Sequence, residues 1–111
     1  MVLLTETLKK LHVETIDEAI KLIAWADVDW GTDGLLDGDD GCIGAALPPD
    51  HTDEQCREFL NALAFDYNNG YGLQVVYGTI MLKNGVWLER EEYDGAEWWE
   101  YRCVPQYHPE H

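Results

Sequence analysis

The chain has 111 residues, of which 22 are Asp or Glu and 7 are Lys or Arg, so its formal net charge is −15. Hydrophobic residues make up 46% of it and include five Trp and six Tyr, which indicates a folded globule and excludes a disordered acidic tail. So few basic side chains cannot form a phosphate-binding footprint, and we expect neither direct nucleic-acid binding nor attachment to an anionic membrane. A field of this sign favours basic proteins as partners.

The cysteines and the first residues indicate the compartment. Cys42, Cys56 and Cys103 are odd in number and lack CxxC spacing, which favours reduced thiols. Residues 1–4 form too short an apolar run for a signal peptide, and no stretch approaches the length of a membrane span. We therefore expect a cytoplasmic protein.

The first part of the chain predicts two helices. The spacing of apolar residues favours a short helix over residues 3–12, with a stripe formed by Leu4, Leu8 and Leu11. Thr15 and Glu18 then make a capping-box pattern, in which each side chain can bond a backbone N–H at the start of a helix. The apolar stripe behind this box predicts a second helix to about Ala26; its members are Ile16, Ala19, Ile20 and Ile23.

A third helix is predicted after Pro48-Pro49. Thr52 and Gln55 repeat the capping-box pattern, and Asn68-Asn69-Gly70 supplies a left-handed stop at the other end. The stripe that we expect to be buried consists of Cys56, Phe59, Leu60, Leu63 and Ala64.

Residues 27–49, between the second and third predicted helices, hold five Gly and six Asp and predict a long irregular loop. Residues 43–47 are compatible with a short strand inside it. Aligned from Asp37, the loop has Gly41, Cys42 and Pro48 where an EF-hand needs a carboxylate, a glycine and a glutamate, so that calcium motif is absent. A solvated acidic loop or a surface for a basic partner is the remaining interpretation.

The last third of the chain predicts two β-hairpins in tandem. Asn84-Gly85 and Asp94-Gly95 are typical of two-residue hairpin turns, whose central residues need positive φ. We therefore predict an α+β fold in which two to three helices pack on one face of a three-stranded antiparallel β-meander. The chain reads as a single domain over residues 1–111, with a helical part over 1–70, including the Asp/Gly-rich loop 27–49, and tandem hairpins over 71–107.

The predicted register of these hairpins sorts their side chains onto two faces. With two-residue loops, Lys83 pairs with Val86 and Tyr93 pairs with Ala96. One face, which we expect to pack on the helices, holds Met81, Val86, Leu88, Tyr101 and Cys103, with Thr79, Arg90 and Trp99 alongside. The other face holds Ile80, Leu82, Trp87, Glu89, Glu91, Trp98, Glu100 and Arg102. The opposed carboxylates of Glu89 and Glu100 disfavour folding, which favours a binding role for this second face.

Catalytic and metal-binding patterns are weak. The chain has no Ser, and Cys56 lies on an apolar stripe, so no nucleophile with a base is indicated. Cys103, His108 and His111 offer three zinc ligands and lack a nearby fourth. Without a Walker loop or a GxGxxG motif we expect no bound cofactor. A small hydrolase that uses paired carboxylates or a metal ion stays open as an alternative, its candidate residues being Glu89, Glu91 and Glu100.

One segment resembles known proteins. Gly78-Thr79-Ile80, Asn84-Gly85-Val86-Trp87 and residues 92–100 look like a stretch of small uncharacterised proteins of bacteriophages and prophages. That group has no activity to carry over. In size and acidity the chain is also similar to phage-encoded anti-defence inhibitors, including anti-CRISPR proteins and DNA mimics. The resemblance implies a phage protein in the host bacterial cytoplasm and transfers no functional residue.

These observations predict a non-enzymatic inhibitor that occupies a basic, nucleic-acid-binding surface of a host defence or DNA-processing protein. A homodimeric structural accessory protein is the other alternative. The residues predicted to bind the partner are Trp87, Trp98, Glu89, Glu91, Glu100, Asp33, Asp37, Asp39 and Asp40.

Overall fold

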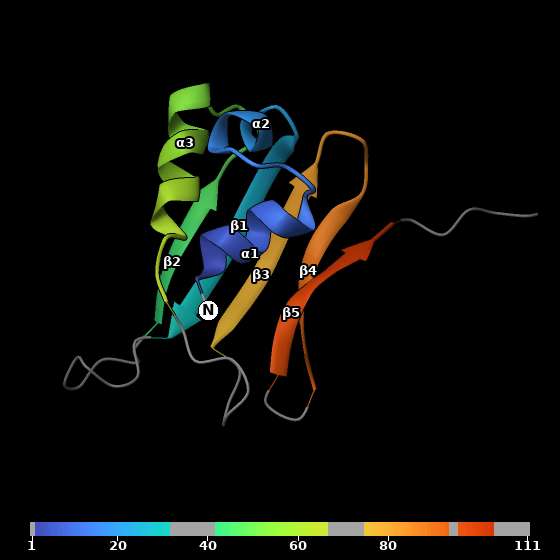
Figure 1. Ribbon diagram of the computed structural model, residues 1–111. Coiled ribbons are helices and arrows are strands. Elements are labelled where there is room, and N and C mark those ends of the chain that lie inside the picture. The colour runs from blue at the N-terminus through green and yellow to red at the C-terminus, as the bar shows by residue number, and fades with distance from the viewer. Residues whose placement is uncertain (1, 32–41, 67–74, 94–95, 104–111) are drawn as a thin grey trace, which may run out of the picture.

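The computed structural model describes residues 2–31, 42–66, 75–93 and 96–103 (Figure 1). Its helices and strands, in chain order, are α1 (Leu3–Lys10), α2 (Ile16–Ile20), β1 (Ile23–Gly31), β2 (Cys42–Leu47), α3 (Asp53–Ala62), β3 (Val76–Leu82), β4 (Trp87–Tyr93) and β5 (Ala96–Arg102). None of the helices in this described part is long and apolar enough to cross a membrane.

The strands form one five-stranded sheet in the order β2-β1-β3-β4-β5, and all neighbouring pairs are antiparallel. The three helices lie on the same face of the sheet (Figure 1). The α+β class therefore holds, whereas the predicted three-stranded meander is wrong because two further strands, β1 and β2, extend the sheet beyond β3.

Strand β1 was not predicted, because the apolar helical pattern of α2 continues into its first residue. Thr15 caps α2 as predicted, its hydroxyl accepting from the Glu18 N–H at 3.2 Å, but the helix ends at Ile20 instead of Ala26. From Ile23 onward Ala26 and Val28 are buried while Asp27 is exposed, which is the alternation of a strand. Ile23 continues the apolar helical stripe of α2, and a register shift between Ile23 and Trp25 allows it to be buried with Ala26 and Val28 although it is out of phase with their alternation.

The other two helices begin where the sequence patterns predict but end earlier: α1 ends at Lys10, and Ala64, expected in the buried stripe, lies beyond the end of α3 and is exposed. In α3 the Thr52 N–H donates to Gln55 Oε1 at 2.8 Å and the Gln55 N–H donates to Thr52 Oγ1 at 3.1 Å, so both halves of the capping box are present. The predicted stop at residues 68–70 lies outside the described residues, and α3 ends earlier, at Ala62. The short strand predicted over residues 43–47 is confirmed as β2.

The two hairpins differ in how well their register was predicted. The β4–β5 register, from Tyr93–Ala96 to Trp87–Arg102, is confirmed. In the β3–β4 hairpin the loop is longer: the Leu82 N–H donates to the Val86 carbonyl at 2.9 Å, leaving residues 83–85 between them. Ile80 consequently pairs with Leu88 instead of Glu89.

A shift of one residue transfers every side chain of a strand to the opposite face. Ile80 and Leu82, predicted on the same face as Glu89 and Glu100, are buried under the helices, while Thr79 and Met81 lie on the face of those two glutamates.

The core lies between the helices and the sheet. It includes Leu3 and Leu11 of the N-terminal region, Phe59, Leu60 and Leu63 of the α3 region, and Ile23, Val28, Ile80, Leu88 and Trp99 of the sheet.

A buried group of charges joins α1 to the sheet. The Arg90 side chain on β4 is fully buried and donates to Glu6 of α1 at 2.9 Å and to Glu97 of β5 at 2.8 Å. Glu97 also accepts the backbone N–H groups of Val75 and Val76, at 2.7 and 2.9 Å. These bonds satisfy charges that would otherwise be costly to bury, and they fix the start of β3 against β5.

Trp99 adds a second connection between the same elements. Its Nε1–H donates to Thr7 Oγ1 at 2.8 Å, and the Thr7 hydroxyl donates to the Leu3 carbonyl at 2.8 Å. The Arg90 guanidinium carbon lies 4.9 Å from the centre of the Trp99 ring, a cation–π distance. Helix α1 is therefore positioned by polar groups on β4 and β5 as well as by its apolar stripe.

Gly78, in the middle of β3, is required by the close approach of β1. Its φ is +142°, and a Cβ atom there would lie 2.3 Å from the Asp27 carbonyl oxygen and 2.7 Å from the Val28 Cα atom. Both neighbours are backbone atoms, which cannot rotate away. The β1–β3 pairing in the centre of the sheet thus depends on this glycine.

We expect Gly78→Ala to lower the free energy of unfolding by about 2–4 kcal/mol, since it adds backbone strain to a clash. Gly85→Ala is the matched control: Gly85 also has positive φ, +90°, but nothing lies within 4 Å of the added Cβ. Urea unfolding followed by circular dichroism measures both. Equal losses for the two variants would contradict the role assigned to the close approach.

Substitution of two arginines compares the contribution of a buried ion pair to stability with that of an exposed one. Arg90→Met leaves carboxylates in the core and should cost about 3–5 kcal/mol. Arg102→Met also removes the partner of two carboxylates, Glu89 and Glu91, but this side chain is 41% exposed, and we expect a loss below about 1 kcal/mol. Chemical denaturation compares them, and a loss at Arg90 as small as that at Arg102 would show that the buried group does not hold the fold.

Candidate partner-binding surface

The sheet face opposite the helices brings acidic and aromatic side chains together. We call it the open face, because the three helices lie on the other side of the sheet (Figure 1). Cross-strand pairing assigns to it alternate residues of β1, β3, β4 and β5. The open face consists of Trp25, Asp27, Asp29, Tyr77, Thr79, Met81, Trp87, Glu89, Glu91, Tyr93, Ala96, Trp98, Glu100 and Arg102.

A row of carboxylates crosses the middle of this face. Asp27 of β1 pairs with Thr79 of β3, Thr79 pairs with Glu89 of β4, and Glu89 pairs with Glu100 of β5. Neighbouring strands are about 4.8 Å apart, so the carboxylates of Glu89 and Glu100 are directly opposed. This arrangement concentrates negative charge on one surface.

Aromatic side chains lie on both sides of the acidic row. On one side Trp25, Met81 and Trp87 are cross-strand neighbours, each partly buried. On the other side Tyr77 is 52% exposed and Trp98 is 38% exposed, more than their packing in a core would allow. An acidic centre between aromatic flanks is a surface that can stack on and pair with guanidinium groups.

One cation lies on the open face. The Arg102 Nε lies 3.6 Å from Glu89 Oε2, and its Nη2 donates to Glu91 Oε1. The three other carboxylates of the open face, Asp27, Asp29 and Glu100, have no ion pair with Arg102. The open face therefore keeps a negative balance after its internal pairing.

The predicted binding residues divide into two groups. Trp87, Trp98, Glu89, Glu91 and Glu100 lie together on the open face, as the β4–β5 register required. The predicted aspartates of the loop lie outside the described residues; they are Asp33, Asp37, Asp39 and Asp40.

Sequence reasoning missed the contribution of β1 and β3 to this face. Trp25, Asp27 and Asp29 were assigned to the end of a helix and to a loop, and Tyr77 was assigned to no surface. The signal was present in residues 25–30, where Trp, Asp and Asp alternate with Ala, Val and Trp. Such alternation is typical of a strand with one buried face.

Three hollows of the described chain are lined in part by residues of the helices or of their C-caps. A groove of about 570 Å³ runs between α1 and β5, a hollow of about 320 Å³ lies beside Leu82 and Tyr101, and one of about 300 Å³ lies between β2 and α3. Each is lined by at most one carboxylate, so none of the three has paired carboxylates for hydrolysis. Within the described chain no three His, Cys, Asp or Glu side chains gather as metal ligands.

The thiol of Cys56 has a structural environment. The side chain is fully buried in the core, and desolvation, with a smaller effect of Asp53, raises its pKa. A raised pKa lowers the fraction of reactive thiolate. Cys56 therefore packs as a small apolar residue, as its place on the helical stripe indicated.

Comparison of the chain with protein-family models, with curated proteins and with solved structures gives no match in any of the three.

We expect Glu100→Gln to raise the free energy of unfolding by about 0.2–1 kcal/mol at low salt, since it removes a carboxylate directly opposite Glu89. At about 1 M NaCl, where the Debye length is about 3 Å, the gain should shrink. Urea unfolding at the two salt concentrations measures this, with Glu58→Gln on the exposed side of α3 as a control of equal charge change. A gain that is the same at both salt concentrations would show that repulsion is not its source.

Proposed function

We propose that the protein is a small acidic inhibitor, encoded by a phage, whose open face binds the basic nucleic-acid-binding surface of a host defence or DNA-processing protein. The observation that carries the proposal is the open face itself: five carboxylates and one arginine, flanked by exposed aromatic side chains, on a sheet surface without helices among the described residues. A surface built only for stability would separate its like charges.

The two kinds of side chain have separate roles in this proposal. The carboxylates, together with the net charge of −15, steer a basic partner toward the face and accept hydrogen bonds from Arg and Lys side chains. The aromatic rings of Trp98 and Tyr77 supply apolar contact area and planes on which guanidinium groups stack. A protein surface that binds phosphates presents the complementary groups.

The test uses a variant in which the acidic row is neutral: Asp27→Asn, Glu89→Gln and Glu100→Gln together. The matched control, with the same change in net charge, replaces three exposed carboxylates of the helix side: Glu14→Gln, Glu54→Gln and Glu58→Gln. Immobilised proteins are incubated with bacterial lysate at low and high salt, and the retained proteins are identified by mass spectrometry.

We expect the unchanged protein and the control to retain the same basic proteins at low salt and to lose them at high salt or on addition of duplex DNA. The row-neutral variant should retain at least about tenfold less, as the loss of several charge contacts implies. No retained basic protein at low salt, or equal retention by both variants, would overturn the proposal.

A second experiment separates two versions of this function. If aromatic anchors dominate, Trp98→Ala should weaken binding by about 2 kcal/mol or more, which is about thirtyfold in the dissociation constant. If the face imitates the charge of DNA, the same variant should lose little, since the energy is spread over many carboxylates. Circular dichroism confirms folding first, and titration against the retained partner gives the two constants.

A further inference from the structure

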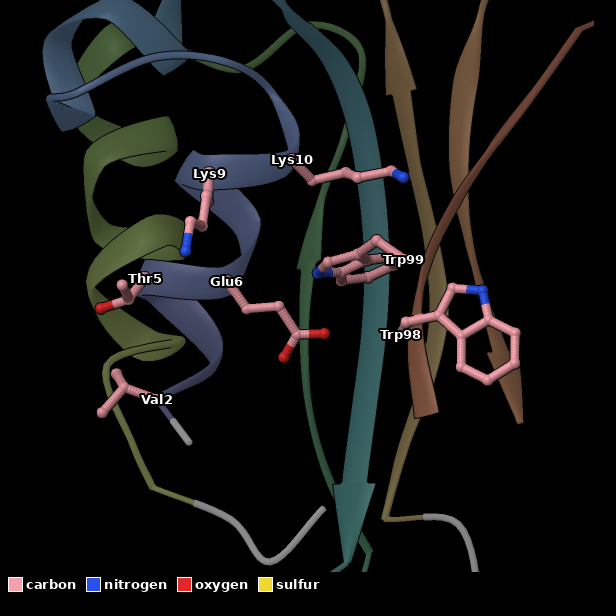
Figure 2. Close-up of a pocket in the computed structure, with 7 residues that line it drawn as sticks. All are labelled: Val2, Thr5, Glu6, Lys9, Lys10, Trp98 and Trp99. Atoms are coloured by element: carbon pink, nitrogen blue, oxygen red, sulfur yellow. The ribbon is translucent and has the colours of Figure 1, made fainter. Parts of the chain in front are cut away.

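The groove between α1 and β5 has the walls of a peptide-binding site. Its helix wall is formed at helical spacing by Val2, Thr5, Glu6, Lys9 and Lys10, and its strand wall by Trp98 and Trp99 (Figure 2). The volume of about 570 Å³ falls within the range of about 300–1,000 Å³ that is usual for ligand sites. Figure 2 shows Trp99 turned toward α1 and Trp98 turned away from it, so that the strand itself edges the groove.

The strand wall of the groove is an edge of the sheet. Strand β5 is last in the order β2-β1-β3-β4-β5, and in the described residues it pairs with β4 alone. Alternate backbone N–H and C=O groups of an edge strand point away from its neighbour and can pair with an added strand. An extended peptide that pairs with β5 would have α1 along one side.

The charge of the groove is opposite to that of the chain. Each of the three arginines has a carboxylate partner: Arg57 with Asp17, Arg90 with Glu6 and Glu97, and Arg102 with Glu89 and Glu91. Among the described residues no carboxylate lies within ion-pair distance of Lys9 or Lys10. The carboxylate of Glu6, which also lines the groove, is bonded to Arg90 at 2.9 Å.

The absence of such pairs is informative in a chain with 22 acidic residues and 7 basic ones. Lys9 and Lys10 remain available at one end of the groove, and the Lys10 ammonium lies 5.1 Å above the ring of Tyr101, which holds it beside β5. The carboxylates of the open face lie across the sheet, and exposed charges are screened beyond about 8 Å at physiological salt. The local positive end therefore favours an acidic group.

We propose that this groove binds an extended acidic peptide segment, which adds to β5 as a sixth strand of the sheet. Main-chain hydrogen bonds to β5 supply affinity, an apolar side chain of the peptide packs against the exposed Val2, and an acidic side chain meets Lys9 and Lys10. The site does not include the acidic row of the open face, although Trp98 borders both surfaces, and it selects a partner of the opposite charge.

The first test uses a random twelve-residue peptide library displayed on phage and panned on the full chain. We expect selected peptides with alternating apolar residues and at least one Asp or Glu, and the tightest of them is then synthesised. Lys9→Glu with Lys10→Glu should weaken its binding at least about tenfold. Lys21→Glu with Lys83→Glu, the same change in net charge beside another hollow, should leave binding within about twofold.

The second test asks whether the peptide pairs with the strand. N-methylation of one alternating set of peptide amides should abolish binding, whereas methylation of the other set should not, because only every second amide faces β5. Hydrogen exchange at residues 97–101 should slow when the peptide binds. The row-neutral variant of the open face should bind the peptide as well as the unchanged protein does, which keeps the outcomes for the two surfaces apart.

Several outcomes would overturn this assignment. They are a library without enriched acidic peptides, equal losses for the two lysine pairs, and equal effects of the two methylation patterns. Light scattering supplies a further one: if the free protein is a dimer whose β5 amides already exchange slowly, a second copy occupies the edge and the groove does not serve a peptide.

Discussion

The burial of one guanidinium group determines much of this architecture. Arg90 has no exposed side-chain surface, and its charge is compatible with the core because Glu6 and Glu97 reach it from two other elements. Glu97 in turn accepts two backbone N–H groups at the start of β3. An ion placed in a core must be paired and hydrogen-bonded or it destabilises the fold, so α1, β3, β4 and β5 have one compatible arrangement around it. Specific placement of α1 is the result.

This arrangement separates the charges of the molecule into three environments. The buried arginine orders the core, Arg102 moderates the acidity of the open face, and the lysines of the groove face solvent without carboxylate partners among the described residues. Because all three helices cover the same side of the sheet, the acidic row and the lysine end of the groove lie on different surfaces (Figure 1). A chain with a large negative net charge thus presents surfaces of both signs, which no average over its composition reveals.

Local sequence signals predicted the elements that depend on local geometry. The capping box of Thr52 and Gln55 and the β4–β5 turn specify their structures through residues close together in the chain. Strand β1 was missed because Ile23 continues the helical stripe of Ile16, Ala19 and Ile20, so the helix was extended over the alternation of residues 25–30 that marks the strand. The β3–β4 loop is one residue longer than its Asn-Gly signal indicates, which moved Ile80 to the opposite face. For the candidate site, β4 and β5 were predicted, while the aspartates of β1 were missed although residues 25–30 alternate as a strand does. The partners of Arg90 could not be predicted, since nothing local marks a pair separated by 84 residues.

That separation also sets an order of events during synthesis. Glu6 is made 84 residues before the arginine that it binds, and at about 5–20 residues per second this interval is about 4–17 s. The interval between the synthesis of Thr7 and that of Trp99, whose indole donates to it, is longer still, because 92 positions separate them. Helix α1 is only 8 residues long, too short to be stable by itself in water, and its polar partners lie in β4 and β5, which are made after it. Helix α1 is therefore made before β4 and β5 but reaches its native position only with them, and the apolar side of the growing sheet stays uncovered there until the β4–β5 hairpin closes.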